Sequence, residues 1–564
     1  MAVQQTGQQG LGRWVREGTP WIWLNAGALS ISLMAVVGLL GYIFLKGVVH
    51  FWPHDIIEAD YLVQEGGAYE LVLGEIADSE TLATTRLREA GEWVHGDAIE
   101  TTRKLLKVGN RDVFGQDFRW VVAPRLENRR YPEDLWLIER REWGNFYGRI
   151  VNVKEAGRLV AEGEAAWPQV VARVARANEL AERVTDIQKD DIGTVNYRIE
   201  QLRLDERRLQ LEHAPNPVPA AALAALEVER KALAVEYETL AGELGKLNEQ
   251  MRRDAITVRV SDGSEHEITL AKVVFVERPN ALGFFAKVGH FFGKLWEFVS
   301  ADPRESNTEG GIFPAIFGTV MMVFLMTLIV TPFGVIAAIY LREYASQGWM
   351  TRTVRIAVNN LAGVPSIVYG VFGLGFFVYF LGGSIDALFF PEAAPAPVFG
   401  TPGLLWASLT LALLTVPVVI VATEEGLSRV PKSIREGSLA LGATKAETLW
   451  RIVLPIVSPA IMTGMILAIA RAAGEVAPLM LVGVVKLAPT LPLDGNAPFL
   501  HLDRKFMHLG FHIYDVGFQS PNVEAARPLV YATAFLLVAV VALLNIVAIV
   551  IRNRLRENNK ALEN

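Results

Sequence analysis

The chain has 564 residues, of which 51% are hydrophobic and 20% charged, with a formal net charge of −7 and no cysteine. This length exceeds one ordinary domain, and the high apolar content points to membrane segments beside polar ones. The negative charge argues against a nucleic-acid binder with a basic surface, and the lack of cysteine excludes disulfides, cysteine–zinc sites, iron–sulfur clusters and thiol catalysis.

The first apolar segment, Trp21–Leu45, is long enough to cross a bilayer. Tryptophans stand at its start and Trp52 follows its end, as expected of interfacial anchors. A cleaved signal peptide is the alternative, but the segment is too long for one and shows no clear small-residue cleavage pattern. We therefore predict a cytoplasmic segment over 1–20 and a transmembrane helix over 21–46.

Residues 47–300 are predicted to form one inserted, periplasmic domain. Its first part contains β-type runs such as YELVLGEI and DFRWVVAP. Two long helices are expected next, over about 164–212 and 220–253, separated by the proline-rich turn HAPNPVP. The second repeats leucine every seven residues, at Leu226, Leu233, Leu240 and Leu247. This repeat predicts an antiparallel coiled-coil arm over about 164–253.

The segment over about 282–299 has the pattern of an amphipathic helix. One helical face is apolar and carries Phe285, Val288, Phe292, Leu295 and Val299, whereas Lys287, His290 and Lys294 lie elsewhere. Two locations fit this pattern, the membrane surface and the surface of the inserted domain.

Residues 301–557 are expected to form a core with five further spans. The predicted spans are Ile312–Tyr340, Leu361–Leu381, Gly403–Thr423, Ile456–Val485 and Leu529–Ile551. Basic residues precede the first span, at Arg13 and Arg16, and gather in the loops after the second, fourth and sixth spans. These are alternate loops, so the positive-inside rule places both termini and the tail 558–564 in the cytoplasm. The expected fold class is a polytopic α-helical membrane protein with six transmembrane helices and an α+β extracytoplasmic domain.

The loop over 425–455, between the fourth and fifth spans, contains a glutamate followed by small and apolar residues at a fixed spacing. They are Glu436, Gly437, Ser438, Gly442, Ile452, Leu454 and Pro455. We expect a short helix over 434–440, a break at Gly442 and a second helix that starts near Thr444. A short helix with small residues can seat in a concave partner surface.

This spacing resembles the E-A-A-x(3)-G-x(9)-I-x-L-P motif of permease subunits of bacterial ABC importers, with Gly437 and Ser438 in place of the two alanines. The family places this coupling helix in a cleft of a cytoplasmic ATPase. The chain has no G-x-x-x-x-G-K-[ST] motif, so we expect a pore subunit and not an enzyme. ATP is then bound by a separate ATPase, and no cofactor or metal is expected in this chain.

Three further stretches narrow the substrate: NTEGGIFPAIFGT at 307–319, NLAGVPSIVYGVFGLG at 360–375 and ARAAGEVAPL at 470–479. With the coupling motif they resemble the PstA family of phosphate permeases, over the first span and about 305–557. The resemblance implies an inner-membrane subunit for phosphate import that works with a PstC-like permease, a PstB-like ATPase dimer and a PstS-like periplasmic phosphate-binding protein. A permease for sulfate or molybdate, or a membrane-anchored scaffold or sensor that uses the arm, are the alternatives.

Arg471 and Glu475 lie four residues apart within the expected fifth span. A charge near the bilayer centre costs ~2.5–3.5 kcal/mol and usually marks a function. The family implicates charged residues of the spans in phosphate passage, and arginine can face phosphate with two parallel hydrogen bonds. We therefore expect both residues in the substrate pathway, with Glu475 neutralising Arg471 at rest; a structural ion pair is the alternative. Pro478 should bend the helix beside them.

A group of histidines, His501, His508 and His512, precedes the last span. Imidazole is a zinc ligand, but the sequence has no H-E-x-x-H motif. We therefore assign no metal site to this loop.

Overall fold

The computed structural model describes residues 18–64, 66–94, 98–520 and 523–560. Arg13, Arg16 and the end of the expected tail, from residue 561, lie outside the described residues. Within the described residues, six helices are long and apolar enough to cross a membrane: Pro20–Val49, Phe313–Tyr344, Ser366–Phe389, Leu404–Arg429, Lys445–Ala473 and Ala526–Arg554. The predicted class of polytopic helical membrane protein is thereby confirmed.

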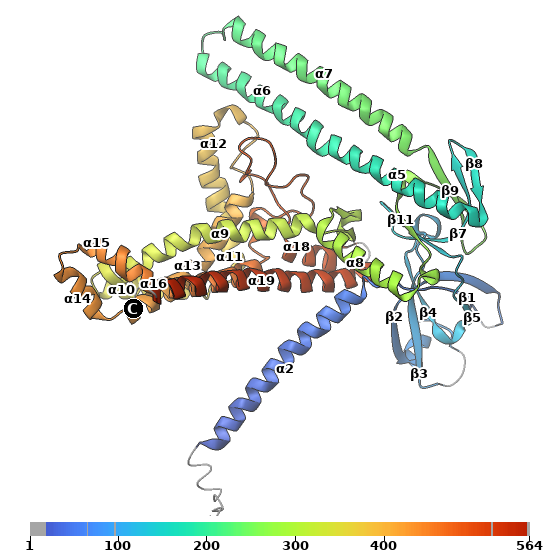
Figure 1. Ribbon diagram of the computed structural model, residues 1–564, viewed down its shortest axis with the longest axis horizontal. Coiled ribbons are helices and arrows are strands. Elements are labelled where there is room, and N and C mark those ends of the chain that lie inside the picture. The colour runs from blue at the N-terminus through green and yellow to red at the C-terminus, as the bar shows by residue number, and fades with distance from the viewer. Residues whose placement is uncertain (1–17, 65, 95–97, 521–522, 561–564) are drawn as a thin grey trace, which may run out of the picture.

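The centre of the bundle is formed by α9 (Phe313–Ile339), α13 (Leu404–Arg429), α16 (Leu454–Ala473) and α19 (Val523–Lys560) (Figure 1). Small residues let these helices approach closely. A Cβ atom added at Gly464 would lie 2.7 Å from the Cβ of Ala422, and one at Gly426 would lie 2.6 Å from that of Ala460. Close backbone approach of this kind is how membrane helices gain van der Waals contact without a hydrophobic driving force between them.

The first helix, α2 (Thr19–Val49), contacts the bundle near its C-terminal end and diverges from it toward its N-terminus (Figure 1). The rings of Tyr42 and Tyr531 lie 6.0 Å apart. A Cβ at Gly47 would lie 2.8 Å from the Cα of Ala532, which shows how tightly this end of α2 meets α19.

Two spans, the third and the fifth, lie at positions shifted from those predicted. The third span is displaced toward the C-terminus. It comprises α11 (Ser366–Phe372), a π-helical stretch (Gly373–Gly382) and α12 (Gly383–Phe389). A separate helix, α10 (Trp349–Leu361), which was not predicted, ends just before it. Pro365 disfavours helical geometry in the residue before it, so the chain cannot continue as one helix through this point.

The fifth span starts at Lys445 and ends at Ala473, so the predicted range Ile456–Val485 was wrong at both ends. Gly474 and Glu475 close the helix with N–H bonds to the carbonyls three residues earlier, at 3.3 and 3.2 Å. Pro478 could not donate to the Gly474 carbonyl, so the helix stops here and does not bend as predicted. A short helix, α17 (Leu479–Val482), follows.

The inserted domain between α2 and α9 contains two antiparallel sheets. The first has the order β4-β3-β2-β1-β5 and the second β10-β9-β7-β6-β11, with β8 paired to β7. The strands of the first sheet are β1 (Ile56–Leu62), β2 (Tyr69–Ala83), β3 (Glu100–Lys107), β4 (Phe118–Val122) and β5 (Leu126–Arg130). Those of the second are β6 (Trp136–Arg140), β7 (Phe146–Glu155), β8 (Arg158–Glu162), β9 (Asp254–Arg259), β10 (Glu265–Thr269) and β11 (Val273–Glu277).

Short elements complete the inserted domain and its junction with the membrane. They are α3 (Thr84–Glu89), α4 (Arg111–Phe114), α8 (Phe284–Ser300), and the two-residue strands β12 (Pro303–Arg304) and β13 (Glu309–Gly310). The backbone N–H of Ile312 donates to the Phe298 carbonyl at 2.8 Å, which fixes the end of α8 beside the start of α9.

A long helical arm leaves the second sheet after β8 and returns to it at β9 (Figure 1). It consists of α5 (Ala166–Asp186), a π-helical turn (Ile187–Asp191), α6 (Ile192–His213) and α7 (Ala220–Met251). Leu202 and Leu233 are buried between α6 and α7, with Leu226 and Leu240 beside them. Since β7 and β9 pair with each other, both ends of the arm are held in one sheet.

The arm rests on loops of the membrane core. Arg208 on α6 pairs with Glu392 at 2.6 Å, in the loop after α12. The Tyr197 hydroxyl donates to the carbonyl of Ala497, in the loop after α17. These loops, the inserted domain and the start of α9 share one end of the bundle, here termed the insertion side. Helices α10, α14 (Lys432–Ala440) and α15 (Lys445–Thr448) and the C-terminal end of α19 lie at the other end, the coupling side (Figure 1).

Candidate functional site

The loop over 425–455, here termed the coupling loop, contains two short helices, α14 and α15, joined at a sharp break. Helix α14 ends before Gly442, whose φ of +88° is a left-handed conformation that favours glycine. Thr444 begins α15 with a capping box. The Glu447 N–H donates to Thr444 Oγ1 at 3.2 Å, and the Thr444 N–H donates to the Glu447 carboxylate at 2.9 Å. Residues close together in the sequence therefore determine the bend between α14 and α15.

The second half of the motif joins the loop to the fifth span. Ile452 lies in a π-helical turn, Leu449–Val453, and Leu454 and Pro455 begin α16. A proline in a regular helix lacks a donor and its ring clashes with the preceding turn. The wider π turn just before Pro455 accommodates that ring. Residues 445–473 therefore form one continuous helical segment, from the coupling loop to Arg471.

One side of α14 is fixed and the other is open. Ser438 is buried, and its hydroxyl lies 2.8 Å from that of Thr448 on α15. Glu436, Gly437 and Gly442 are exposed. A Cβ placed at Gly437 would meet no heavy atom within 4 Å, and the side chain of Leu441, at the tip, is 91% exposed. The motif thus presents a small, open helix face beside an apolar tip.

Ion pairs that the sequence analysis missed tie the coupling loop to the bundle. Arg435 on α14 pairs with Glu343 at the coupling end of the second span, at 2.9 Å, and donates to the Leu427 carbonyl at 2.7 Å. Arg355 on α10 pairs with Glu424 on α13 at 3.1 Å. The sequence does place opposite charges near helix ends on the coupling side. However, Arg435 and Glu343 are 92 positions apart in the sequence, so their pairing depends on the tertiary fold.

Arg471 and Glu475 lie at the insertion-side end of the fifth span and not midway along it. Arg471 is in the last turn of α16, whereas Glu475 is in the turn that follows. Arg471 Nε and Glu475 Oε1 are 3.8 Å apart, and the two side chains are 32% and 22% exposed. This is an ion pair without hydrogen-bond geometry, so either partner can exchange it for another ligand.

The turn that holds Glu475 packs closely against the third span. A Cβ at Gly370 on α11 would lie 2.6 Å from the Cα of Pro478, and one at Gly373 would lie 2.3 Å from Thr410 Oγ1. These two glycines of the third span therefore serve close packing. Through it, the position of the turn is coupled to α11 and α13.

The three histidines each have a structural contact. His508 Nδ1 accepts the Gly510 N–H at 3.1 Å and caps α18 (Leu509–Tyr514), and His501 Nε2 lies 2.9 Å from Asp494. Burial lowers the pKa of His508 and of His512 to about 4, which keeps both neutral at physiological pH. Among the described residues, no group of three histidine, aspartate or glutamate side chains is placed to hold a metal ion.

Comparison with known proteins shows what the membrane core is similar to. Residues 330–557 match the family model described as the binding-protein-dependent transport system inner membrane component. This range contains the coupling loop, Arg471 and Glu475. The phosphate transport system permease protein PstA 1 of Mycobacterium tuberculosis is 41% identical over 175 residues, which cover 31% of this chain and 52% of that protein. The membrane core is PstA-like.

Two other relatives show how far this similarity extends. The probable ABC transporter permease protein YqgH of Bacillus subtilis is 33% identical over 203 residues, 35% of this chain and 62% of that protein. The phosphate transport system permease protein PstC of Xylella fastidiosa is 33% identical over 219 residues, 37% of this chain and 65% of that protein. The chain thus spans between about half and two thirds of each relative. The family match begins within α9, after the inserted domain.

Proposed function

We propose that this chain is the PstA-like permease subunit of an ATP-driven importer of inorganic phosphate in the bacterial inner membrane. The observation that carries the proposal is the complete coupling motif, folded as an exposed helix with an open face at Gly437, in a core similar to PstA. A scaffold or sensor has no need of such a helix.

The proposed assembly assigns one partner to each exposed part of the core. A PstB-like ATPase dimer, which binds the ATP, receives α14 on the cytoplasmic, coupling side. A PstC-like permease completes the translocation pathway within the membrane. A PstS-like binding protein delivers phosphate to the insertion side, which is periplasmic in this orientation, so that both termini are cytoplasmic.

The continuous helical segment 445–473 supplies a mechanical link for alternating access. Its first turn is capped at Thr444, beside α14, and its last turn carries Arg471. A displacement of α14 by the ATPase would move this segment as a rod. Arg471 would then shift relative to Glu475, which is held in the turn against Pro478 and α11. Phosphate can replace Glu475 at the guanidinium when the arginine faces the pathway.

Reconstitution tests this function. The chain, co-expressed with PstC-like and PstB-like subunits and reconstituted with its binding protein, should take up labelled phosphate only when ATP is supplied on the coupling side. Excess sulfate or molybdate should leave this uptake unchanged. Strong competition by either anion would favour a permease for another oxyanion. A purified chain that associates with no ATP-hydrolysing subunit would favour the scaffold.

The arm is proposed to position the binding protein above the core. It lies on the loops of the insertion side, where substrate would arrive, and Arg208–Glu392 holds it there. R208E should weaken stimulation of ATP hydrolysis by the binding protein, by up to about fivefold for an ion pair of ~1 kcal/mol. The swapped pair R208E/E392R should restore the stimulation. Equal stimulation of the wild-type and R208E complexes at subsaturating binding protein would contradict this role.

A further inference from the structure

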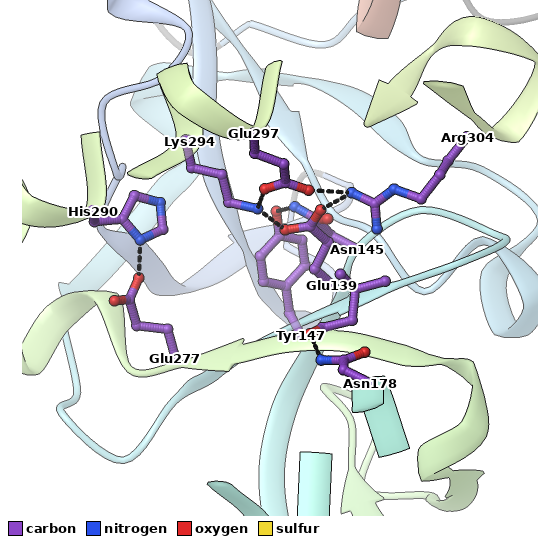
Figure 2. Close-up of polar contacts among 10 residues, drawn as sticks. Glu139, Asn145, Tyr147, Asn178, Glu277, His290, Lys294, Glu297 and Arg304 are labelled. Atoms are coloured by element: carbon purple, nitrogen blue, oxygen red, sulfur yellow. Dashed lines mark hydrogen bonds and ion pairs between the residues drawn. The ribbon is translucent and has the colours of Figure 1, made fainter. Parts of the chain in front are cut away.

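Helix α8 has its polar face turned toward the protein and its apolar face turned away from it. His290 Nδ1 lies 2.7 Å from Glu277 on β11, and Lys287 lies 2.5 Å from Asp55. Lys294 pairs with Glu139 on β6 (Figure 2). A helix on the surface of a soluble domain has the opposite arrangement, with its apolar stripe packed on the core.

The ion pairs beneath α8 form a buried network that fixes its orientation. Arg304 contacts Glu139 at 2.5 Å and Glu297 at 2.9 Å, and Lys294 contacts Glu297 at 2.8 Å (Figure 2). Burial raises the pKa of Glu139, but Lys294 and Arg304 outweigh it and lower that pKa to about 2. Glu139 therefore stays ionised and paired, and rolling α8 over would take the charge of Lys294 away from this buried carboxylate.

The opposite side of α8 is apolar and uncovered. The residues Phe285, Phe292 and Trp296 are 89%, 61% and 71% exposed. They follow one another at intervals of seven and four residues, so they line one helical face. Gly289 and Gly293 lie between them, and a Cβ at either would meet no heavy atom within 4 Å. These residues form a continuous apolar strip with aromatic rings. Exposure of such a strip to water is unfavourable.

The position of α8 indicates what covers this strip. Trp52, just after α2, lies 6.2 Å from the rings of Phe284 and of Phe291. At the other end of α8, Phe298 is buried against Phe51 at 5.0 Å, and its carbonyl accepts the N–H of Ile312. Both ends of α8 are therefore fixed where α2 and α9 leave the membrane. The strip therefore lies beside the ends of two helices that are long and apolar enough to span a membrane.

We propose that α8 lies in the outer interface of the bilayer, with Phe285, Phe292 and Trp296 at the boundary between headgroups and acyl chains. Aromatic side chains prefer this depth, and an interfacial helix buries its apolar face about 5–10 Å into it. The helix gives the inserted domain a third attachment to the membrane beside α2 and α9. Because the sheet that bears the arm is bound to the polar face of α8, this attachment sets the direction of the arm.

Site-directed spin labelling tests the lipid contact, since the chain has no cysteine to remove. Single variants F285C, F292C and W296C are labelled in the full-length chain in nanodiscs of phosphatidylethanolamine and phosphatidylglycerol. V228C is the control, since Val228 lies on an exposed stretch of α7 and is 70% exposed. The three α8 labels should be relaxed by oxygen and protected from a water-soluble nickel chelate. The V228C label should show the reverse.

Two results would overturn the proposal. In one, the α8 labels are as open to the nickel chelate as the V228C label, so that the strip faces water. In the other, they become protected only when partner subunits are added, so that the strip is a protein interface. All three labelled side chains are exposed, so the substitutions remove no core packing; size-exclusion chromatography of each variant checks this.

Discussion

Replacing Gly437 with phenylalanine should abolish association with the partner ATPase and leave the permease folded. The position is helical and open, so a larger side chain meets nothing in this chain, and replacing a mid-helix glycine with phenylalanine favours the helix by roughly a few tenths of a kcal/mol. The phenyl ring would occupy the space that the concave surface of the ATPase needs in order to contact α14. Co-purification of the ATPase should fall more than about tenfold, which is a loss of ~1.4 kcal/mol in binding.

Two variants control this experiment. G437A restores an alanine of the importer motif and should keep full association, since its methyl group is small. G242F places the same ring at another open, helical glycine, on α7 of the arm, and should leave ATPase binding unchanged. If G437F co-purifies with the ATPase as well as the wild type does, α14 is not the helix that seats in the ATPase.

The coupling loop was predictable because its geometry is set by neighbours in the sequence. Gly442 adopts a positive φ, and Thr444 and Glu447 form a capping box that needs only each other. The end of the fifth span was not predictable from hydropathy, because the residues after Ala473 stay apolar although the helix has ended. Their backbone groups bond within a folded turn and to other loops: the Val482 carbonyl accepts from Gly403, and Val485 donates to Phe506.

Periodicity alone left the location of α8 open, and its contacts show why. Phe285 and Phe292 of the predicted apolar face are exposed, but Trp296 completes the strip, whereas Leu295 is half-buried. The face of α8 that packs on the domain is determined by Glu139 and Glu277, which lie on two strands distant from α8 in the sequence. The same holds for Arg435 and Glu343 at the coupling loop. Ion pairs between residues far apart in the sequence leave no local sequence pattern from which they could be predicted.

Replacing Arg471 with alanine should reduce phosphate uptake by about 10- to 100-fold at a normal level of assembled complex. This is the loss expected when a charge-assisted hydrogen bond of ~1.5–3 kcal/mol is removed from the path of an anion. R471K keeps the charge but not the two parallel donors and should retain part of the activity. T463A, at an exposed position on the same helix, is the control and should transport normally.

Substitution of Glu475 distinguishes between two roles of Arg471, binding of phosphate in the pathway and a purely structural ion pair. If Glu475 competes with phosphate for the guanidinium, E475Q should tighten phosphate retention and slow turnover, because the group that displaces the anion is gone. If the pair only joins the helix end to its turn, R471A and E475Q should lower the thermal stability of the complex alike and leave uptake per assembled complex unchanged. The 3.8 Å separation favours exchange, since a pair without a hydrogen bond offers little resistance to a competing anion. Undiminished uptake by R471A would reject the pathway role.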